Sequence, residues 1–173
     1  MAERISKTYF QEKSAPELAR ELLGKTLVRR FADGSVIRSK ITETEAYFGT
    51  DDLASHASKG RTPRTELMFG AGGHVYVYLI YGKYWLLNIV TGNEKTPEAV
   101  LIRGLEAVSG PGRIGNFLEL DKSFYGEDLE ISERLWLEDS DLEGEIISGP
   151  RVGVDYAGEK WRLMPWRFIL KTK

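Results

Sequence analysis

The stretch HVYVYLIYGKYWLLNIV, from His74 to Val90, predicts the centre of the fold. Its two halves are rich in aromatic and β-branched residues. They meet at Gly82-Lys83, where a glycine in the first loop position suits a type II′ turn. Because side chains along a strand point to alternate faces, this stretch is expected to be a hairpin with Tyr81 beside its turn. One face is expected to carry His74, Tyr76, Tyr78 and Ile80, and the other Val75, Val77, Leu79 and Tyr81.

The segments around this hairpin predict further strands and a few helices. Residues 25–31 and 35–48 flank Ala-Asp-Gly, a sequence that favours a second hairpin turn. A capping box of Ser14 and Glu17 begins a short helix that Gly24 ends, and GPGR at residues 110–113 is expected to lead into another helix. Additional strands are expected over residues 98–107, 134–139, 151–156 and 167–170.

Hairpin connections and few helices predict an α+β fold with a mostly antiparallel sheet. The length of 173 residues fits one domain spanning residues 1–173.

The charge of the chain is small but unevenly distributed. The formal net charge of −2 excludes binding to nucleic acid through overall charge. Residues 118–145 hold 11 Asp or Glu and 2 Lys or Arg, whereas residues 56–64 hold three basic residues, a histidine and no acid. A local basic stripe can therefore meet phosphate while an acidic face points away.

The composition excludes several kinds of site. With no cysteine there is no disulfide, thiolate metal site or Cys nucleophile, and two histidines do not favour a zinc site. No stretch approaches the about 18 apolar residues of a membrane helix, and the start, MAERISKTYF, lacks the apolar core of a signal peptide. We expect a soluble, intracellular protein with no metal, cofactor or membrane partner.

The stretch ITETEAYFGTDDLASHASKGRTPR, from Ile41 to Arg64, carries the chemistry. If the strand stays regular, Ile41, Glu43, Glu45 and Tyr47 share one face. A carboxylate beside aromatic rings can act as a general base on water. The alternative is a surface ion pair between one of these acids and an arginine.

Aromatic residues near these acids suggest a pocket for a flat ring. Tyr47, His56, Tyr76 and Tyr78 are the candidates, although aromatic residues are also common in ordinary sheets. Tyr81 differs because a hairpin tip offers little core packing, so its ring suits a wedge inserted between bases.

Cations lie close to this aromatic set. Lys83 at the hairpin tip, SKGRTPR and GPGR are candidate phosphate contacts or simply solvated loops. Arg103 lies in the apolar run AVLIRGL, where a charge needs a partner, and Glu45 is the first candidate.

Taken together, these stretches resemble the 3-methyladenine DNA glycosylase family, the alkyladenine glycosylases. The resemblance runs in order through ETEAY, DDLASHASKGRTPR, HVYVYLIYGKYWLLNIV, VLIRGLE, GPGR, DKSF and RVGVDYAG. It implies one mixed domain with a curved antiparallel sheet. The implied activity is hydrolysis of the N-glycosidic bond of alkylated or deaminated purines in double-stranded DNA, leaving an abasic site. It also implies no metal, no cofactor and no lyase step. Separately, we expect a monomer and a cytoplasmic or nucleoid location.

The resemblance implies a role for each matching position. Glu45 is the expected general base, with Arg103 and the main chain of Val152 helping to place the attacking water. The base pocket is expected to be walled by Tyr47, His56 and Tyr78, with Asn88 crowding the 2-amino group of guanine. Tyr81 is the expected intercalating residue. The expected contacts with the DNA backbone are Lys59, Arg61, Arg64, Lys83, Gly112 and Arg113.

Three features depart from the family pattern. Thr65 stands where Asn is usual, Leu53 replaces a common Pro, and RFILKTK stops short of a segment that usually follows. The first two are expected to alter the loop near His56, and the third to weaken a DNA contact or a closing strand.

Two other functions compete. A sugar glycosidase would use Glu43 and Glu45 as an acid–base pair, and a non-catalytic module would only stack its rings on bases. Neither needs all of these features: the glycosidase has no use for a tip tyrosine, and the module has no use for a buried arginine beside carboxylates.

Overall fold

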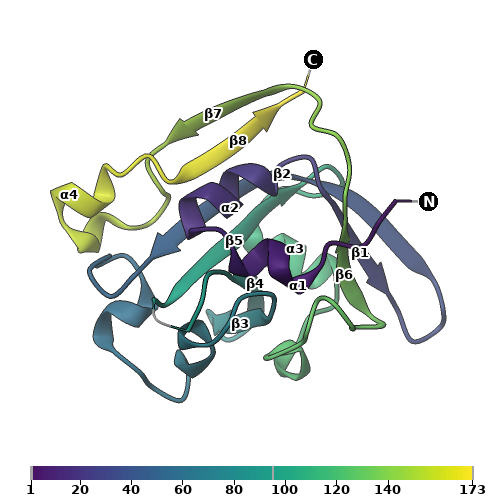
Figure 1. Cartoon of the computed structure of the whole chain (residues 1–173), viewed down its shortest axis with the longest axis horizontal. Coiled ribbons are helices and arrows are strands. Elements are labelled where there is room, and N and C mark those ends of the chain that lie inside the picture. Colours follow the sequence, from purple (N-terminus) through teal and green to yellow (C-terminus); the bar gives the residue numbers. More distant parts are fainter. Residues whose placement is uncertain (1, 95, 173) are drawn as a thin grey trace.

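A computed structural model describes residues 2–94 and 96–172 as one mixed α+β domain (Figure 1). The helices of this part of the chain are α1 (Lys7–Gln11), α2 (Ala15–Glu21), α3 (Pro111–Phe117) and α4 (Glu159–Arg162). Its strands are β1 (Thr26–Arg30), β2 (Val36–Phe48), β3 (Val75–Ile80), β4 (Tyr84–Val90), β5 (Glu98–Leu105), β6 (Leu135–Glu138), β7 (Glu145–Gly149) and β8 (Arg167–Lys171). The predicted α+β class with a curved antiparallel sheet is confirmed.

The long strand β2 connects the parts of the sheet. The sheet runs in the order β3-β4-β5-β2-β1-β6, and β8 adds to β2 with β7 outside it. The first part of β2 pairs with β1, whereas Glu43–Glu45 pair with β5 on one side and with β8 on the other. Figure 1 shows this arrangement, with β7 and β8 at the top, β3 and β4 toward the bottom, and β5 and β2 between them. The centre of β2 is therefore held by ladders on both sides.

The two faces of the sheet have different tasks. On one face Val75, Val77, Leu87 and Ile89 join the main hydrophobic core together with α2 and α3. On the other face the alternate residues, among them Tyr76, Tyr78 and Asn88, line a cavity. The predicted alternation along the hairpin is thus confirmed for β3. His74 is the exception, because its ring lies near Asp128 and does not line the cavity.

The tip of the β3–β4 hairpin differs from the prediction. The pairing of Ile80 with Tyr84 leaves three residues in the loop, and the N–H of Lys83 donates to the carbonyl of Ile80 at 3.1 Å. Tyr81 (φ 51°) and Gly82 (φ 65°) both have positive φ, as in the centre of a type I′ turn. The predicted turn at Gly82-Lys83 is therefore wrong by one residue, and Tyr81 is part of the turn. Tyr81 was also expected on the face of Val75 and Val77, but it borders the cavity on the side of Tyr76 and Tyr78. A positive φ is uncommon for a tyrosine, and the pairing of the flanking strands holds it.

Two other predictions at the level of elements need correction. Residues 151–156 were expected to form a strand, but they form a turn followed by a short 3-10 helix at Asp155–Ala157, where Gly153 (φ 73°) leaves the extended conformation. Strand β7 was not predicted, because EIISG carries little alternation. The helices expected after Ser14 and after Gly110 are confirmed as α2 and α3.

Helix α3 lies unusually close to the hairpin because of a glycine. A Cβ built on Gly115 would lie 2.0 Å from the carbonyl oxygen of Trp85. Only glycine permits this approach, which brings Pro111 at the start of α3 to the edge of the cavity.

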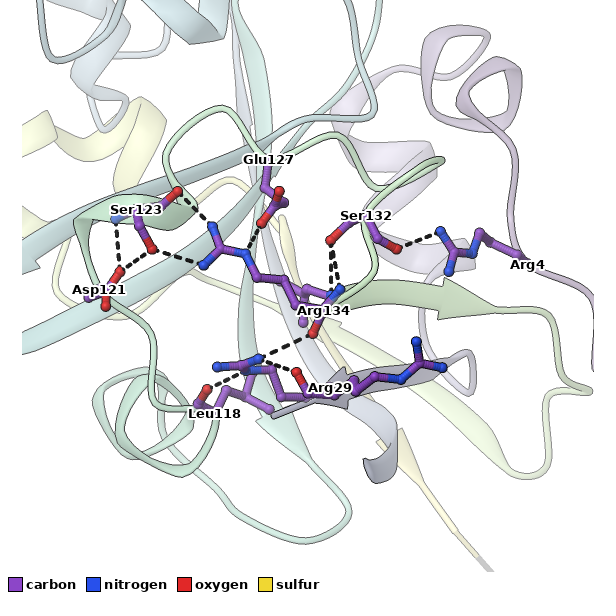
Figure 2. A network of polar contacts seen from close by, with 10 residues as sticks. Arg4, Arg29, Leu118, Asp121, Ser123, Glu127, Ser132 and Arg134 are labelled. Carbon is purple, nitrogen blue, oxygen red and sulfur yellow. Dashed lines mark hydrogen bonds and ion pairs between the residues drawn. The ribbon is translucent and has the colours of Figure 1, made fainter. Parts of the chain in front are cut away.

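Arginines order the acidic segment 118–145 and attach it to the domain: Arg134 binds within the segment, whereas Arg29 reaches it from β1 (Figure 2). Arg134 is ion-paired with Glu127 and donates to the main-chain carbonyl of Ser123 at 2.8 Å. Arg29 on β1 is buried and donates to the carbonyl of Leu118 at 2.7 Å. None of these residues lines the cavity. No helix in the described parts of the chain is long or apolar enough to cross a bilayer.

A buried carboxylate on β5 begins helix α2. Glu98 is 5% exposed and accepts the N–H of Ala15 at 2.7 Å, which satisfies one of the free amides of the first helical turn. Burial raises the pKa of Glu98 from 4.5 to about 7. Below about pH 7 the protonated form of Glu98 therefore predominates in the folded protein.

We predict that Glu98 makes the protein less stable as the pH rises. A folded-state pKa above the unfolded value gives stability that is complete below about pH 4.5 and lost as the pH passes about 7. One unit of pKa corresponds to about 1.4 kcal/mol. Between about pH 5 and about pH 8 the native protein should thus lose roughly 2 kcal/mol more than Glu98→Gln. Urea unfolding of both proteins at the two pH values measures this difference, and equal losses would contradict the prediction.

Candidate active site

A cavity of about 320 Å³ opens on the face of the sheet opposite the main core. Strands β2, β3, β4 and β5 form its floor, and the loops after β2 and β7 form its walls. The structure brings together around it the residues predicted for chemistry and base binding: Glu45, Tyr47, His56, Tyr78, Tyr81, Asn88, Arg103 and Val152. They come from points far apart in the chain.

Glu45 is the acidic residue of this cavity. Its side chain has no exposed surface, and its carboxylate accepts the hydroxyl of Tyr47 at 2.8 Å and the main-chain N–H of Val152 at 2.6 Å. Burial raises the pKa of Glu45, and Arg103, Val152 and Tyr47 act against that increase. The result is a carboxylate that is partly stripped of water yet held in one orientation, as a general base requires.

The first acid of the pair lies in a different environment. Glu43 does not line the cavity, and its carboxylate accepts Nε of Arg103 at 2.7 Å and Nε of Arg167 at 3.2 Å. Glu45 was the partner predicted first for Arg103, but that distance is 3.7 Å. Arg103 is thus paired with a carboxylate as expected, and Glu43 is the principal partner.

An irregularity in the sheet explains this arrangement. The register of β2 against β5 shifts between Ile41 and Glu43 and again between Glu43 and Thr44. As a result Ile41 turns into the main core and does not share the face of Glu45 and Tyr47, so the predicted common face holds only beyond the bulge. Arg103 falls between the paired residues Gly104 and Ile102, and bulges of this kind commonly redirect a side chain next to an active site.

Aromatic rings form the walls of the cavity. The rings of His56 and Tyr78 meet edge to face with centroids 4.6 Å apart, and Nδ1 of His56 lies 3.3 Å from the hydroxyl of Tyr76. Burial, with help from Arg64 and Lys59, lowers the pKa of His56 from 6.5 to about 4, so His56 is neutral at neutral pH. Burial raises the pKa of Tyr76 to about 12. Asn88, 3% exposed, lies among them on β4.

Tyr81 stands at the mouth of the cavity. Its side chain is 88% exposed, which confirms the expectation that the ring is not part of the core. Lys83, next along the tip, has its Nζ 4.8 Å from the centre of the Tyr84 ring.

The remaining predicted cations are on the surface around the cavity. Lys59, Arg61, Arg64 and Arg113 are all exposed. Arg64 lies over the ring of Tyr78 at 5.2 Å, and Arg61 is ion-paired with Glu66 at 3.3 Å. A Cβ on Gly112 would lie 3.0 Å from the Tyr84 ring, so this backbone runs against the hairpin.

The structure also shows what the two unusual loop residues do. Thr65 is buried, accepts the N–H of Thr62 at 3.0 Å and donates to the carbonyl of Gly60 at 3.0 Å, so it closes the turn of the basic loop. Leu53 is 53% exposed and lines no part of the cavity.

A fully buried ion pair behind the cavity was missed by the sequence analysis. Arg151 donates to both carboxylate oxygens of Asp52, at 2.7 and 2.9 Å, and also to the carbonyl of Ala46 at 3.0 Å. Asp52 in turn accepts the N–H of Phe48 and of Ala54. This pair joins the end of β2 to the loop that carries His56. Asp51 and Asp52 are adjacent in the sequence, and nothing local distinguishes the buried one.

Tyr156 is a second missed residue. It is 70% exposed, lines the cavity and donates its hydroxyl to the carbonyl of Ala54 at 2.9 Å. Its only sequence signal was its place inside RVGVDYAG.

A buried carboxylate in an aromatic cavity, with an exposed ring at its mouth and cations around it, suits an enzyme that acts on nucleic acid. Comparison with known proteins is in agreement. The family model described as methylpurine-DNA glycosylase matches residues 9–110 and 106–173. The chain therefore belongs to the methylpurine-DNA glycosylase family, whose members hydrolyse the N-glycosyl bond of alkylated bases in DNA.

Relatives from distant organisms are similar over almost the whole chain. A protein of Methanocella arvoryzae named "Putative 3-methyladenine DNA glycosylase" is 44% identical, over 94% of this chain and 90% of its own. Proteins with the same name from Anaeromyxobacter dehalogenans strain 2CP-C and Wolbachia pipientis wMel are 46% and 42% identical. The matched regions cover 94% and 97% of this chain, and 81% and 92% of those proteins.

Proposed function

We propose that this DNA glycosylase flips a damaged purine out of duplex DNA and hydrolyses its N-glycosidic bond with a water molecule that Glu45 activates. The observation that carries the proposal is the carboxylate of Glu45, which is unexposed, held by Tyr47 and Val152, and turned to an aromatic cavity. A base inside a duplex cannot reach such a cavity, so it must leave the stack first.

The cavity suits an alkylated purine, which carries a positive charge. The faces of tyrosine rings attract cations, and Tyr47 and Tyr78 line the cavity. His56 adds no opposing charge because its pKa is lowered to about 4. Neutral deaminated purines fit the same flat space by stacking. Asn88 on the floor is proposed to crowd the 2-amino group of guanine.

Each remaining group has a step in this mechanism. Glu45 takes a proton from water, and the water oxygen bonds to C1′ of the sugar while the bond to the purine nitrogen breaks and its electron pair leaves with the base. Positive charge builds on the sugar at this point, and the carboxylate stabilises it. Arg103 and the main chain of Val152 are proposed to orient the water. The products are a free base and an abasic site.

The surface around the cavity is proposed to hold the duplex. Lys59, Arg61, Arg64, Lys83 and Arg113, with the backbone of Gly112, are the proposed contacts to phosphate. Tyr81 would enter the gap that the flipped nucleotide leaves. The acidic segment 118–145 would then face away from the DNA.

Two other functions explain the site less well. A sugar glycosidase using both acids requires Glu43 to face the substrate, but Glu43 does not line the cavity and is bound to Arg103 and Arg167. A module that only stacks on bases has no use for a buried carboxylate held by two donors.

We further propose that the chain acts as a single domain and a monomer, in the compartment that holds the DNA. Light scattering during gel filtration, with and without duplex, measures its molecular mass. One chain per duplex is the expected result.

We predict that Glu45→Gln binds damaged DNA but loses turnover. Removal of a general base typically lowers the rate by ~10²–10⁴. Release of free methylated purine from methylated duplex DNA, measured under single-turnover conditions, tests this. A Glu45→Gln rate within about threefold of the native rate, with Glu43→Gln inactive, would identify Glu43 as the base and contradict the proposal.

A second prediction is that the enzyme does not nick the strand. No lysine lines the cavity within the described residues, so no amine is placed to attack C1′ and form a Schiff base. Borohydride added during turnover should therefore trap no covalent protein–DNA adduct. An adduct that disappears in Lys59→Gln or Lys83→Gln would show a lyase mechanism instead.

The third prediction concerns Tyr81→Ser. Base–aromatic stacking is worth ~1–3 kcal/mol, so the substitution should lower the fraction of flipped substrate, and with it the rate, by roughly one to two orders of magnitude. The loss should shrink when the damaged base lies in a bulge, where flipping costs less.

Thermal unfolding provides the control for Tyr81→Ser. The ring is 88% exposed, so the unfolding temperature should barely change. Equal rate losses on paired and bulged substrates would assign Tyr81 to general binding and not to flipping.

A further inference from the structure

Glu43 lies between two guanidinium groups at the bulge of β2. Its carboxylate accepts Nε of Arg103 on β5 at 2.7 Å, and Nε and Nη2 of Arg167 on β8 at 3.2 and 3.5 Å. A Cβ on Gly104 would lie 3.0 Å from Cβ of Glu43 and 2.8 Å from the hydroxyl of Thr42, so glycine at 104 permits this crowded crossing. Contacts from β5 and β8, together with the glycine at 104, therefore fix the position of Glu43.

Arg103 is within reach of both acids of β2. Its Nε lies 2.7 Å from Glu43 and 3.7 Å from Glu45. The first distance is a charge-assisted hydrogen bond, whereas the second is an ion pair without one. The strongest interaction of Arg103 is therefore with Glu43, the acid that does not line the cavity.

Which of the two acids Arg103 hydrogen-bonds affects how strong a base Glu45 is. A guanidinium in direct hydrogen-bond contact favours the ionised form of a carboxylate and makes it a weaker base. A weaker base takes a proton from water less readily. If Glu43 were neutral, Arg103 would be free to shorten its contact with Glu45.

We propose that Glu43 is a positioning residue which retains Arg103 at its Nε and so keeps the carboxylate of Glu45 basic enough to activate water. The inference rests on the proposed role of Glu45. Arg167 partly compensates the negative charge of Glu43 and so weakens the repulsion between Glu43 and Glu45.

Other charged and titratable groups also face Glu45 and stay constant in the test. They are Tyr47 on β2, Tyr78 on β3, and Arg151 and Tyr156 from the segment after β7. Burial remains the main reason that the pKa of Glu45 is raised.

The test is the pH dependence of base release from methylated duplex DNA, under single-turnover conditions, for Glu43→Gln and Arg167→Gln. In Glu43→Gln the acid limb of the profile should move to lower pH by about one unit, and the plateau rate should fall roughly tenfold. In Arg167→Gln, Glu43 holds Arg103 alone and presents more negative charge. The acid limb should then move in the opposite direction, with a plateau at least as high as that of the native enzyme.

Glu127→Gln is the matched control. Glu127 is 21% exposed against 17% for Glu43. It is likewise paired with an arginine, Arg134 (Figure 2), but it does not line the cavity. Its profile should coincide with that of the native enzyme.

Two outcomes overturn the inference. One is a Glu43→Gln enzyme that is slower but has an unmoved acid limb, which would indicate a merely structural role. The other is a shift of the acid limb in the same direction in Glu43→Gln and in Arg167→Gln. Arg167 is 31% exposed, so Arg167→Gln should fold. If Glu43→Gln does not fold, the acid limb of the Arg167→Gln profile decides: a shift to higher pH supports the inference, and an unmoved limb contradicts it. Absence of base release by the native enzyme would instead refute the proposed function.

Discussion

The structure depends on holding one carboxylate, that of Glu45, out of water while compensating its charge. Burying an ionised group is costly unless hydrogen bonds and an opposite charge compensate. Here the compensation comes from three directions: the hydroxyl of Tyr47 on the same strand, the amide of Val152 from the segment after β7, and the charge of Arg103 on β5. These donors can meet only if β2 is fixed at its centre, and it is the one strand with ladders to both β5 and β8.

The buried pair of Arg151 and Asp52 also helps to fix the residues around Glu45. Such a pair rarely adds to stability, because the cost of desolvation offsets the attraction, but loss of one partner is severe. Its geometry indicates a positional task. Arg151 precedes the residue that donates to Glu45, and Asp52 holds the loop that leads to His56. One ion pair thereby fixes two walls of the cavity relative to the end of β2.

The hairpin serves both sides of the domain. Alternate residues of β3 and β4 belong to the core or line the cavity, so the strands that make the domain stable also form the floor of the site. The tip extends beyond this packing and leaves Tyr81 exposed. Stability and the proposed DNA contact are thus separated along a single element. In that proposal the exposed ring at the tip acts on the duplex at little cost to folding.

The sequence by itself determined the hairpin, the helices after Ser14 and Gly110, the α+β class and the candidate aromatic and acidic residues of the cavity, although not Tyr156. Local patterns carry this information, because alternation, capping and turn chemistry act over a few residues. The ordered resemblance to the glycosylase family supplied the rest of the set.

Only the tertiary structure decided which acid Arg103 binds, which aspartate is buried, and where the hairpin turns. The partner of Arg103 depends on a bulge that strands 60 residues apart make together, and no local pattern encodes it. Asp52 and not Asp51 is buried because Arg151 meets it across 99 residues. The turn moved to Tyr81-Gly82 because the register of the whole β3–β4 ladder sets the loop. Residues 151–156 look like a strand, yet they turn at Gly153 and present the amide of Val152 to Glu45. For Arg103, Asp52 and Val152 a contact distant in sequence outweighs a local preference, since a buried charge without its partner is costly. In the hairpin the register of the ladder outweighs the turn preference of Gly82-Lys83.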